Sequence, residues 1–183
     1  MFRWMPYAIM ALSLGAFYAC GAKQANTFSA QYQKGHDAYQ AGRRTEAIAA
    51  YRDAVRLKPD SAEAHNDLGV VLYDVGERDA AIQEYQRALR LNPDYPEAHN
   101  NLGVAFLASG QIAAAAAEHR HAVDARPEFT AARYNLCLDL EILGQLSEAL
   151  HQCQVASDRD PSQAGIAAAI ERLGRKLSEV GSD

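Results

Sequence analysis

The sequence predicts an all-α protein built from repeated helix pairs, and three observations lead to this prediction. Prolines recur at intervals of 34 residues, at Pro59, Pro93, Pro127 and Pro161. Glycines keep the same interval, at Gly42, Gly76, Gly110 and Gly144. Between these positions the apolar residues follow the period of an α-helix. Internal repetition at one fixed period indicates stacked copies of a supersecondary unit.

Each unit is expected to contain two helices. In the second unit, the apolar residues of the first helix are Leu68, Leu72 and Val75, and those of the second are Ala81, Tyr85, Ala88 and Leu89. Gly76 stands where the first helix should end in a left-handed residue, and Pro93 stops the second helix. Asp60 with Glu63, and Asp94 with Glu97, have capping-box spacing, which predicts the starts of the first helices.

The units resemble tetratricopeptide repeats. The best matches are Ala64-His-Asn-Asp-Leu-Gly69 with Gly76, Ala81, Tyr85, Ala88 and Pro93, and Ala98-His-Asn-Asn-Leu-Gly103 with Gly110, Ala115, Ala122 and Pro127. The resemblance implies a right-handed superhelical array of four hairpins at residues 28–61, 62–95, 96–129 and 130–163. His65 and His99 depart from the family, which usually has Trp there, and Lys34 stands in place of the usual Leu.

A further helix is expected after the fourth unit, at residues 164–183. Its apolar residues fall on one face, at Ile166, Ile170, Leu173, Leu177 and Val180, and its charges lie elsewhere. Terminal repeats need a helix with a polar outer face to cover them. This segment therefore predicts a capping helix.

The N-terminal segment predicts export. Arg3 precedes an apolar stretch of 15 residues from Met5 to Ala19, which is the pattern of a signal peptide over residues 1–19. Phe17-Tyr-Ala-Cys20 resembles the bacterial lipobox, although that motif usually has Leu for Phe17 and a small residue for Tyr18. The resemblance implies a lipid on Cys20, followed by a linker at residues 20–27, and Gly21 resembles lipoproteins sorted to an outer membrane. Cleavage after Ala22, or an uncleaved anchor from Met5 to Ala22, are the alternatives.

The tetratricopeptide resemblance also implies a concave groove lined by the first helices, where such arrays bind extended peptides. By helical spacing, the face left open beside the packing residues contains Tyr32, His36, Tyr39, Asn66, Val70, Tyr73, Asn100, Val104, Leu107, Tyr134, Leu138 and Glu141. At its edge lie Asp67, Asn101 and Asn135. Asn101 and Asn135 resemble the asparagine ladder of peptide-binding arrays; the alternative is that they only solvate a helix face.

Charge and motif content exclude several functions. The formal net charge is −5, with no cluster of Lys or Arg, so neither nucleic acid nor a polybasic membrane surface is expected as a partner. A clamp for a terminal carboxylate is disfavoured because Glu63, Asp67 and Glu97 stand in the central repeats. No phosphate-binding loop, nucleophile elbow or metal-ligand spacing occurs. The chain is therefore expected to be no enzyme and to hold no cofactor and no metal.

Cys137 and Cys153 are expected on the two helices of the fourth hairpin, facing one another. In the family resemblance they replace the usual small and aromatic residues. They form either a disulfide, which an exported protein can keep, or two small buried thiols.

These observations together predict a non-catalytic tetratricopeptide adaptor of the bacterial envelope. It would be tethered through the Cys20 lipid, would face the periplasm from the outer membrane, and would bind a segment of a partner protein. The resemblance is to small repeat lipoproteins that help to assemble pili, secretion channels or similar complexes. A regulatory subunit of an envelope enzyme, an adaptor anchored in the inner membrane, and a purely structural spacer are the alternatives.

Overall fold

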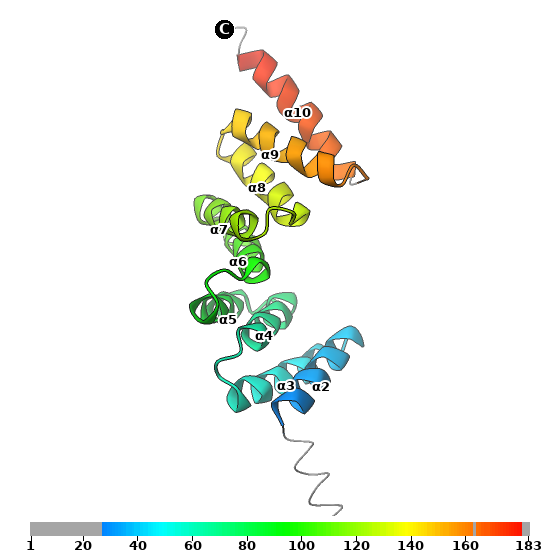
Figure 1. The fold of residues 1–183 in the computed structure, drawn as a ribbon, viewed down its shortest axis with the longest axis vertical. Coiled ribbons are helices and arrows are strands. Elements are labelled where there is room, and N and C mark those ends of the chain that lie inside the picture. The colour runs from blue at the N-terminus through cyan, green and yellow to red at the C-terminus, as the bar shows by residue number, and fades with distance from the viewer. Residues whose placement is uncertain (1–26, 163, 181–183) are drawn as a thin grey trace, which may run out of the picture.

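A computed structural model describes residues 27–162 and 164–180 of the chain, and these residues form α-helices and turns without a β-strand (Figure 1). The four hairpins are α2 (Phe28–Gln40) with α3 (Arg44–Leu57), α4 (Ala62–Asp74) with α5 (Arg78–Leu91), α6 (Pro96–Ala108) with α7 (Ile112–Ala125), and α8 (Thr130–Ile142) with α9 (Leu146–Arg159). Helix α10 (Ala164–Val180) follows. The predicted all-α fold is confirmed. The expected signal peptide, Cys20 and most of the linker lie outside the described residues.

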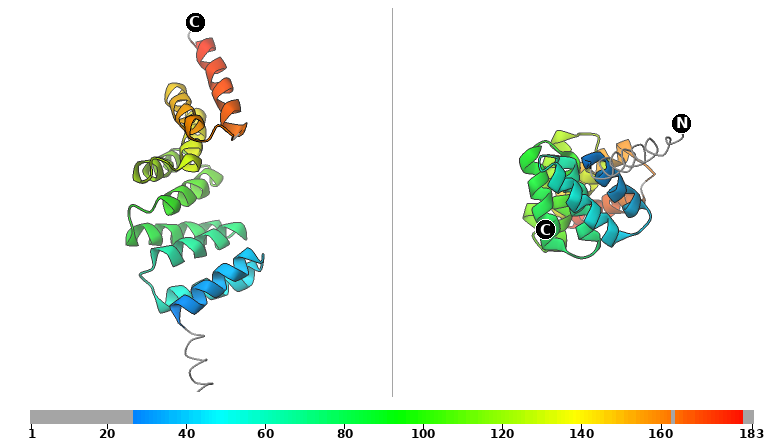
Figure 2. Two further views of the ribbon diagram at one scale, coloured as in Figure 1. Left: turned by 45° about the vertical axis from the view of Figure 1, so that its right-hand side comes forward. Right: turned by 90° about the horizontal axis from the view of Figure 1, so that it is seen from below.

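The hairpins stack into an elongated superhelical array, with α2 and α10 at opposite ends (Figures 1 and 2). Each hairpin packs against the next, because a second helix lies against the first helix of the following unit. Alanines occupy the closest contacts and have no exposed surface, at Ala47, Ala81, Ala115, Ala149, Ala54, Ala88, Ala122 and Ala156. These small residues let the helices approach closely. None of α2 to α10 has the length and apolar character needed to cross a membrane.

The four interhelical glycines adopt the left-handed conformation that the sequence predicts. Gly76 has φ +85°, and the other three lie at +74° or +75°. In each turn the residue after the glycine donates its N–H to a carbonyl of the first helix; for example, the N–H of Glu77 lies 2.9 Å from the oxygen of Leu72. This is the Schellman arrangement, which satisfies the last carbonyls of a helix. It fixes the same hairpin geometry in all four units.

The helix starts differ from the expected capping boxes. Ser61, rather than Asp60, is the N-cap of α4, and its hydroxyl accepts the N–H of Ala64 at 3.3 Å. Helix α6 has Tyr95 at its N-cap and Pro96 at its first turn, so Asp94 lies outside the helix. Proline is suited to this position because the first N–H groups of a helix have no intrahelical partner. Both helices therefore begin one residue later than the capping-box spacing predicts.

Helix α10 takes the place that the first helix of a fifth unit would occupy. It begins 34 residues after α8 and packs against α9 and the edge of α8 through Ile166, Ala169 and Leu173, all buried. In the four units a small residue stands where the second helix crosses the first, at Gly35, Gly69, Gly103 and Cys137. The equivalent residue of α10 is Glu171, which is exposed. α10 thus covers the array and presents a polar face outward.

Candidate partner-binding groove

The predicted groove residues lie on first helices and are mostly half-buried. His36 is exposed, and Tyr32, Tyr39, Val70, Tyr73, Asn100, Asn101, Val104, Leu107, Tyr134, Asn135 and Leu138 are half-buried. Asn66 departs from the expectation, because only 4% of its surface is exposed. The neighbouring repeat covers it, and its amide is used inside the array. Asn66 is therefore a structural residue and not part of the groove surface.

A ladder of side-chain hydrogen bonds joins the first helices of successive repeats. Asn101 donates to the oxygen of Asn66 at 3.0 Å, and Asn135 donates to that of Asn100 at 3.0 Å. At the equivalent place between repeats one and two, the Tyr32 hydroxyl donates to Asp67 at 2.5 Å. Each pair is 35 residues apart, one more than the repeat length. Asn101 and Asn135, the predicted ladder asparagines, thus each donate one amide hydrogen to a bond that holds neighbouring repeats in register.

A second row of pairs lies two helical turns further along the same helices. The Tyr39 hydroxyl donates to Asp74 at 2.9 Å, and Arg44 lies against both residues, with its Nε 3.4 Å from Asp74 and its guanidinium 4.7 Å from the Tyr39 ring centre. At the other end of the row, Glu141 takes part in the corresponding pair with Lys176.

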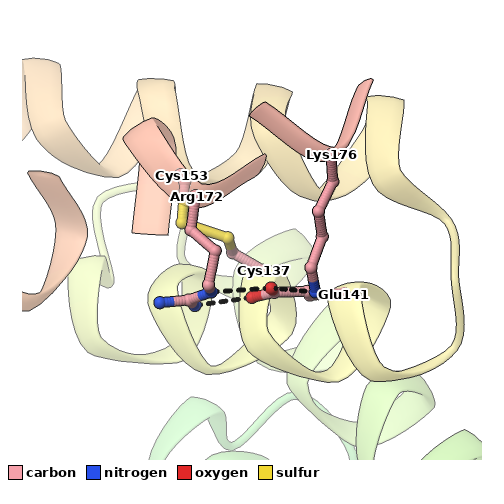
Figure 3. A network of polar contacts seen from close by, with 5 residues as sticks. All are labelled: Cys137, Glu141, Cys153, Arg172 and Lys176. Carbon is pink, nitrogen blue, oxygen red and sulfur yellow. Dashed lines mark hydrogen bonds and ion pairs between the residues drawn. A yellow bond between two sulfur atoms is a disulfide. The ribbon is translucent and has the colours of Figure 1, made fainter. Parts of the chain in front are cut away.

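Glu141 anchors the capping helix to the fourth repeat. Arg172 donates to both of its carboxylate oxygens, at 2.7 and 2.6 Å, and Lys176 donates at 2.7 Å (Figure 3). The hydrogen bonds from Arg172 and then Lys176 lower the pKa of Glu141 to about 2. The groove face at α10 therefore contains two cations, but both are committed to one carboxylate.

A second set of polar contacts repeats where each hairpin follows the one before it. His65 lies 2.6 Å from Glu84 in its own repeat and 3.1 Å from the Pro59 carbonyl of the preceding one. His99 makes the equivalent contacts with Glu118 and Pro93 at 2.6 and 2.8 Å. In the fourth repeat the contacts come from Arg133, to Gln152 at 2.7 Å and to Pro127 at 2.9 Å. These residues hold the second, third and fourth hairpins to the turn before each of them. His65 and His99 therefore form hydrogen bonds in addition to their packing contacts.

The third and fourth repeats also share a buried polar pair that sequence reasoning missed. His119 Nδ1 lies 2.6 Å from Asp139 Oδ2, and neither side chain has exposed surface. Their other polar atoms, His119 Nε2 and Asp139 Oδ1, have no partner among the described residues. The equivalent residues at the preceding interface are Tyr85 and Ala105. The sequence indicates this pair only by the simultaneous replacement of Tyr85 by His119 and of Ala105 by Asp139 one repeat later.

The fourth hairpin is closed by a disulfide. Cys137 on α8 and Cys153 on α9 are joined with a Cα–Cα distance of 5.5 Å, and neither has exposed surface (Figure 3). In the first three units the same two positions are a glycine and an aromatic ring. A Cβ on Gly69 would lie 2.6 Å from Tyr85, and one on Gly103 would lie 2.6 Å from His119. The disulfide therefore replaces a ring-on-glycine contact.

One cavity opens on the groove, at its N-terminal end. It has a volume of about 280 Å³ and is lined by Tyr32, His36, Tyr39, Gln40, Tyr51, Asp67 and Val70. Burial, the hydrogen bond to Asp67 and its charge raise the pKa of Tyr32, and burial followed by the charge of Asp67 raises that of Tyr51. These phenols stay neutral donors at physiological pH. Within the described part of the chain, no three His, Cys, Asp or Glu side chains are grouped to hold a metal ion.

Comparisons with known proteins agree with this geometry. Residues 35–76 and 71–110 match the family model of the TPR repeat. Within residues 35–110 the chain therefore contains tetratricopeptide repeats. Among solved structures, YrrB, a TPR protein with an unusual peptide-binding site, is 21% identical, covers 89% of this chain and 84% of its own, and has a TM-score of 0.75. No curated protein matches the sequence.

Two further solved structures share the fold. PilF of Pseudomonas aeruginosa is 25% identical over 87% of this chain and 72% of its own, with a TM-score of 0.75. The first TPR of Spaghetti (RPAP3), bound to the HSP90 peptide SRMEEVD, is 19% identical over 64% of this chain and 94% of its own, with a TM-score of 0.62. The repeat is ordinarily a non-catalytic interaction fold, and two of these relatives were solved as peptide-binding proteins.

Proposed function

We propose that this protein is a non-catalytic adaptor that binds an extended segment of a partner protein along the first-helix groove. The observation that carries the proposal is the continuous row of amide, tyrosine and aliphatic side chains across the four repeats. The side-chain oxygens of Asn101 and Asn135 have no partner among the described residues. An amide can pair with any peptide unit, and Val104 and Leu107 beside them offer apolar contact.

The charges of the groove favour a partner segment that is not acidic. Asp67 lies in its N-terminal half without an ion pair to any described residue. The cations near the groove, Arg44 in that half and Arg172 and Lys176 at the other end, are paired with Asp74 and Glu141. A carboxylate-rich peptide would meet like charge there, which disfavours association. This groove therefore differs in its electrostatic preference from a site that accepts the peptide SRMEEVD.

The binding proposal is tested by a crosslinking pull-down from membranes with quantitative mass spectrometry. Val104→Glu places a charge in the groove at a half-buried position whose side chain makes none of the hydrogen bonds that hold the repeats together. Ala117→Glu, exposed on α7, is the matched control. Partners that are lost with Val104→Glu and kept with Ala117→Glu bind in the groove. Identical partner sets for both variants and the native chain would contradict the proposal.

We further propose that the adaptor acts in the bacterial envelope, as an outer-membrane lipoprotein facing the periplasm that assists assembly of a pilus, secretion channel or similar complex. The lipobox-like sequence ending at Cys20 supports this location. Intact-mass measurement of the mature chain should show an N-terminal diacyl or triacyl Cys20, and Cys20→Ala should lose it. A mature chain with an unmodified N-terminus, or with residues 1–19 retained, would contradict the lipoprotein.

A further inference from the structure

Two Tyr–Asp pairs link α2 to α4, and they repeat along the helices. Tyr32 donates to Asp67, and Tyr39, seven residues later, donates to Asp74, seven residues after Asp67. Seven residues are about two helical turns, so both pairs lie on the same faces of the two helices. The pairs therefore offer the same chemistry at two neighbouring places.

The second pair already holds a cation. Arg44, from the start of α3, lies with its guanidinium 4.7 Å from the centre of the Tyr39 ring and its Nε 3.4 Å from Asp74. An aromatic face attracts a cation through its quadrupole, and a carboxylate beside it adds an ion pair. The protein thus contains one occupied example of a Tyr–Asp cation site.

The first pair has no such cation. Asp67 accepts hydrogen bonds from two neutral donors, the Tyr32 hydroxyl at 2.5 Å and the Asn66 amide at 3.1 Å, and forms no ion pair with any described residue. Its carboxylate is half-buried beside the 280 Å³ cavity, among the rings of Tyr32, Tyr39 and Tyr51. A partly desolvated carboxylate without a counter-charge is stabilised by a cation that reaches it.

We propose that the Tyr32–Asp67 cavity is a pocket for one lysine or arginine side chain of the bound partner segment. This inference rests on the proposed binding of an extended segment in the groove. The volume admits a side chain of that size, Val70 and the tyrosine rings contact its methylene stem, and Asp67 pairs with its charged end. Burial of an alkyl stem with a paired head is how Lys and Arg ordinarily occupy such sites.

The pocket is specific to the junction of the first two repeats. At the next two junctions Asp67 is replaced by Asn101 and Asn135, and Tyr32 by Asn66 and Asn100. The hydrogen-bonded pairs at those junctions therefore consist of two amides, with neither a carboxylate nor a phenol. A single cation of the partner would therefore set which part of its segment lies at each repeat.

The test uses the full-length chain in detergent and arrays of acetylated, amidated nonapeptides that differ at one position among Arg, Lys, citrulline and Ala. Citrulline keeps the shape of Arg without its charge. The native chain should retain Arg or Lys peptides about tenfold more than their citrulline or Ala counterparts, as expected for a cation–π contact with an ion pair. Asp67→Asn, the residue found at the next two junctions, should abolish this preference.

Two variants control the result. Asp60→Asn removes an exposed charge from the turn before α4 and should leave the preference unchanged. Arg44→Gln vacates the Tyr39–Asp74 pair and should create a second position in the peptide where a cation is preferred. Circular dichroism of each variant checks that the helices are intact.

The possible outcomes separate the two proposals. A cation preference that Asp67→Asn abolishes supports the pocket. Peptide binding without a cation preference, or with one that survives Asp67→Asn, overturns the pocket but leaves the adaptor. No peptide binding by any variant overturns both. A preference that appears only after Lys23 is replaced by Gln would show that the chain's own N-terminal segment fills the pocket, which also overturns a partner side chain as its ligand.

Discussion

The second and fourth repeats have the same helix lengths and turn geometry, but their two helices are held together differently. In the second, Tyr85 packs on Gly69; in the fourth, the same positions form the Cys137–Cys153 disulfide. The comparison teaches that one crossing point can be closed either by shape, which requires a glycine, or by a covalent bond, which does not. At this crossing point the fourth repeat thereby depends on oxidation, whereas the second depends on packing.

Removal of the disulfide should have the largest effect. The Cys137→Ala, Cys153→Ala variant is expected to lose about 3 kcal/mol of unfolding free energy, because the bond restricts a loop of this length in the unfolded chain. Urea denaturation followed by circular dichroism measures the loss, and hydrogen exchange should place it in α8 to α10. Two free thiols in the unreduced denatured protein, counted in a Cys20→Ala background, would contradict the bond.

A double substitution that gives the fourth repeat the Gly–Tyr pair of the second tests the same comparison. Cys137→Gly with Cys153→Tyr gives the fourth repeat the contact of the second and should restore most of the lost stability, without any response to a reducing agent. Failure to restore it would mean that Leu173 of α10, which stands where Asp139 faces His119 one repeat earlier, leaves no room for the ring.

Gly69→Ala should have the next largest effect, on the second repeat. The added Cβ would lie 2.6 Å from Tyr85, so the ring must move, at an expected loss of about 1–3 kcal/mol. Gly174→Ala on α10 is the control, because a Cβ there meets nothing within 4 Å and alanine favours a helix. It should leave the thermal midpoint unchanged or raise it slightly. Equal behaviour of the two variants would refute the role given to the ring contact.

The contacts of Glu141 with Arg172 and Lys176 should contribute about 1 kcal/mol to the free energy of unfolding. The contribution is small because the two cations are partly exposed. The lowered pKa of Glu141 stabilises the fold at pH values above the usual glutamate pKa. This stabilisation is lost as the pH falls through about 2. Glu141→Gln should reduce stability at pH 7 and flatten the acid limb of the stability curve. Glu148→Gln, from an exposed pair with Arg120, should do neither.

The smallest expected effect concerns His99 and compares the third repeat with the fourth. Burial alone would lower the pKa of His99, but its hydrogen bonds to Glu118 and to the Pro93 carbonyl raise it overall. Its contribution is therefore full below the unfolded histidine pKa and declines as the pH rises through the raised value. His99→Gln should lower the free energy of unfolding by about 0.5 kcal/mol at pH 6 and by less at pH 9. Substitution of Arg133, which stays charged, should show no such pH dependence.

The sequence predicts the fold well because its period fixes where each helix ends. Gly76 and Pro93 act locally, through backbone conformation, so their effect can be read without knowledge of the neighbours. The predicted N-caps lie one residue too early. For α4 the reason is that Asp60 and Ser61 are both able to cap a helix, and only the path of the chain decides between them.

The groove was harder to predict because its residues also serve the repeat junctions. Asn66 fits the open face by helical spacing, yet the stagger of 35 residues between bonded partners places it under Asn101. The His119–Asp139 pair was missed for the same reason, since its members lie in different repeats. Contacts within one helix follow from periodicity, whereas contacts between repeats depend on how far each unit rotates against the last.

Glu171 has a consequence for the length of the array. It stands at the place where each preceding unit has a small residue, so α10 cannot accept a crossing second helix without burying a carboxylate. Further copies of the 34-residue unit could be inserted ahead of residue 164. The array would then become longer while its two terminal helices, α2 and α10, stay unchanged. Growth beyond α10 would first require Glu171→Gly. A single acidic side chain thus limits the number of helix pairs that can be stacked in this array.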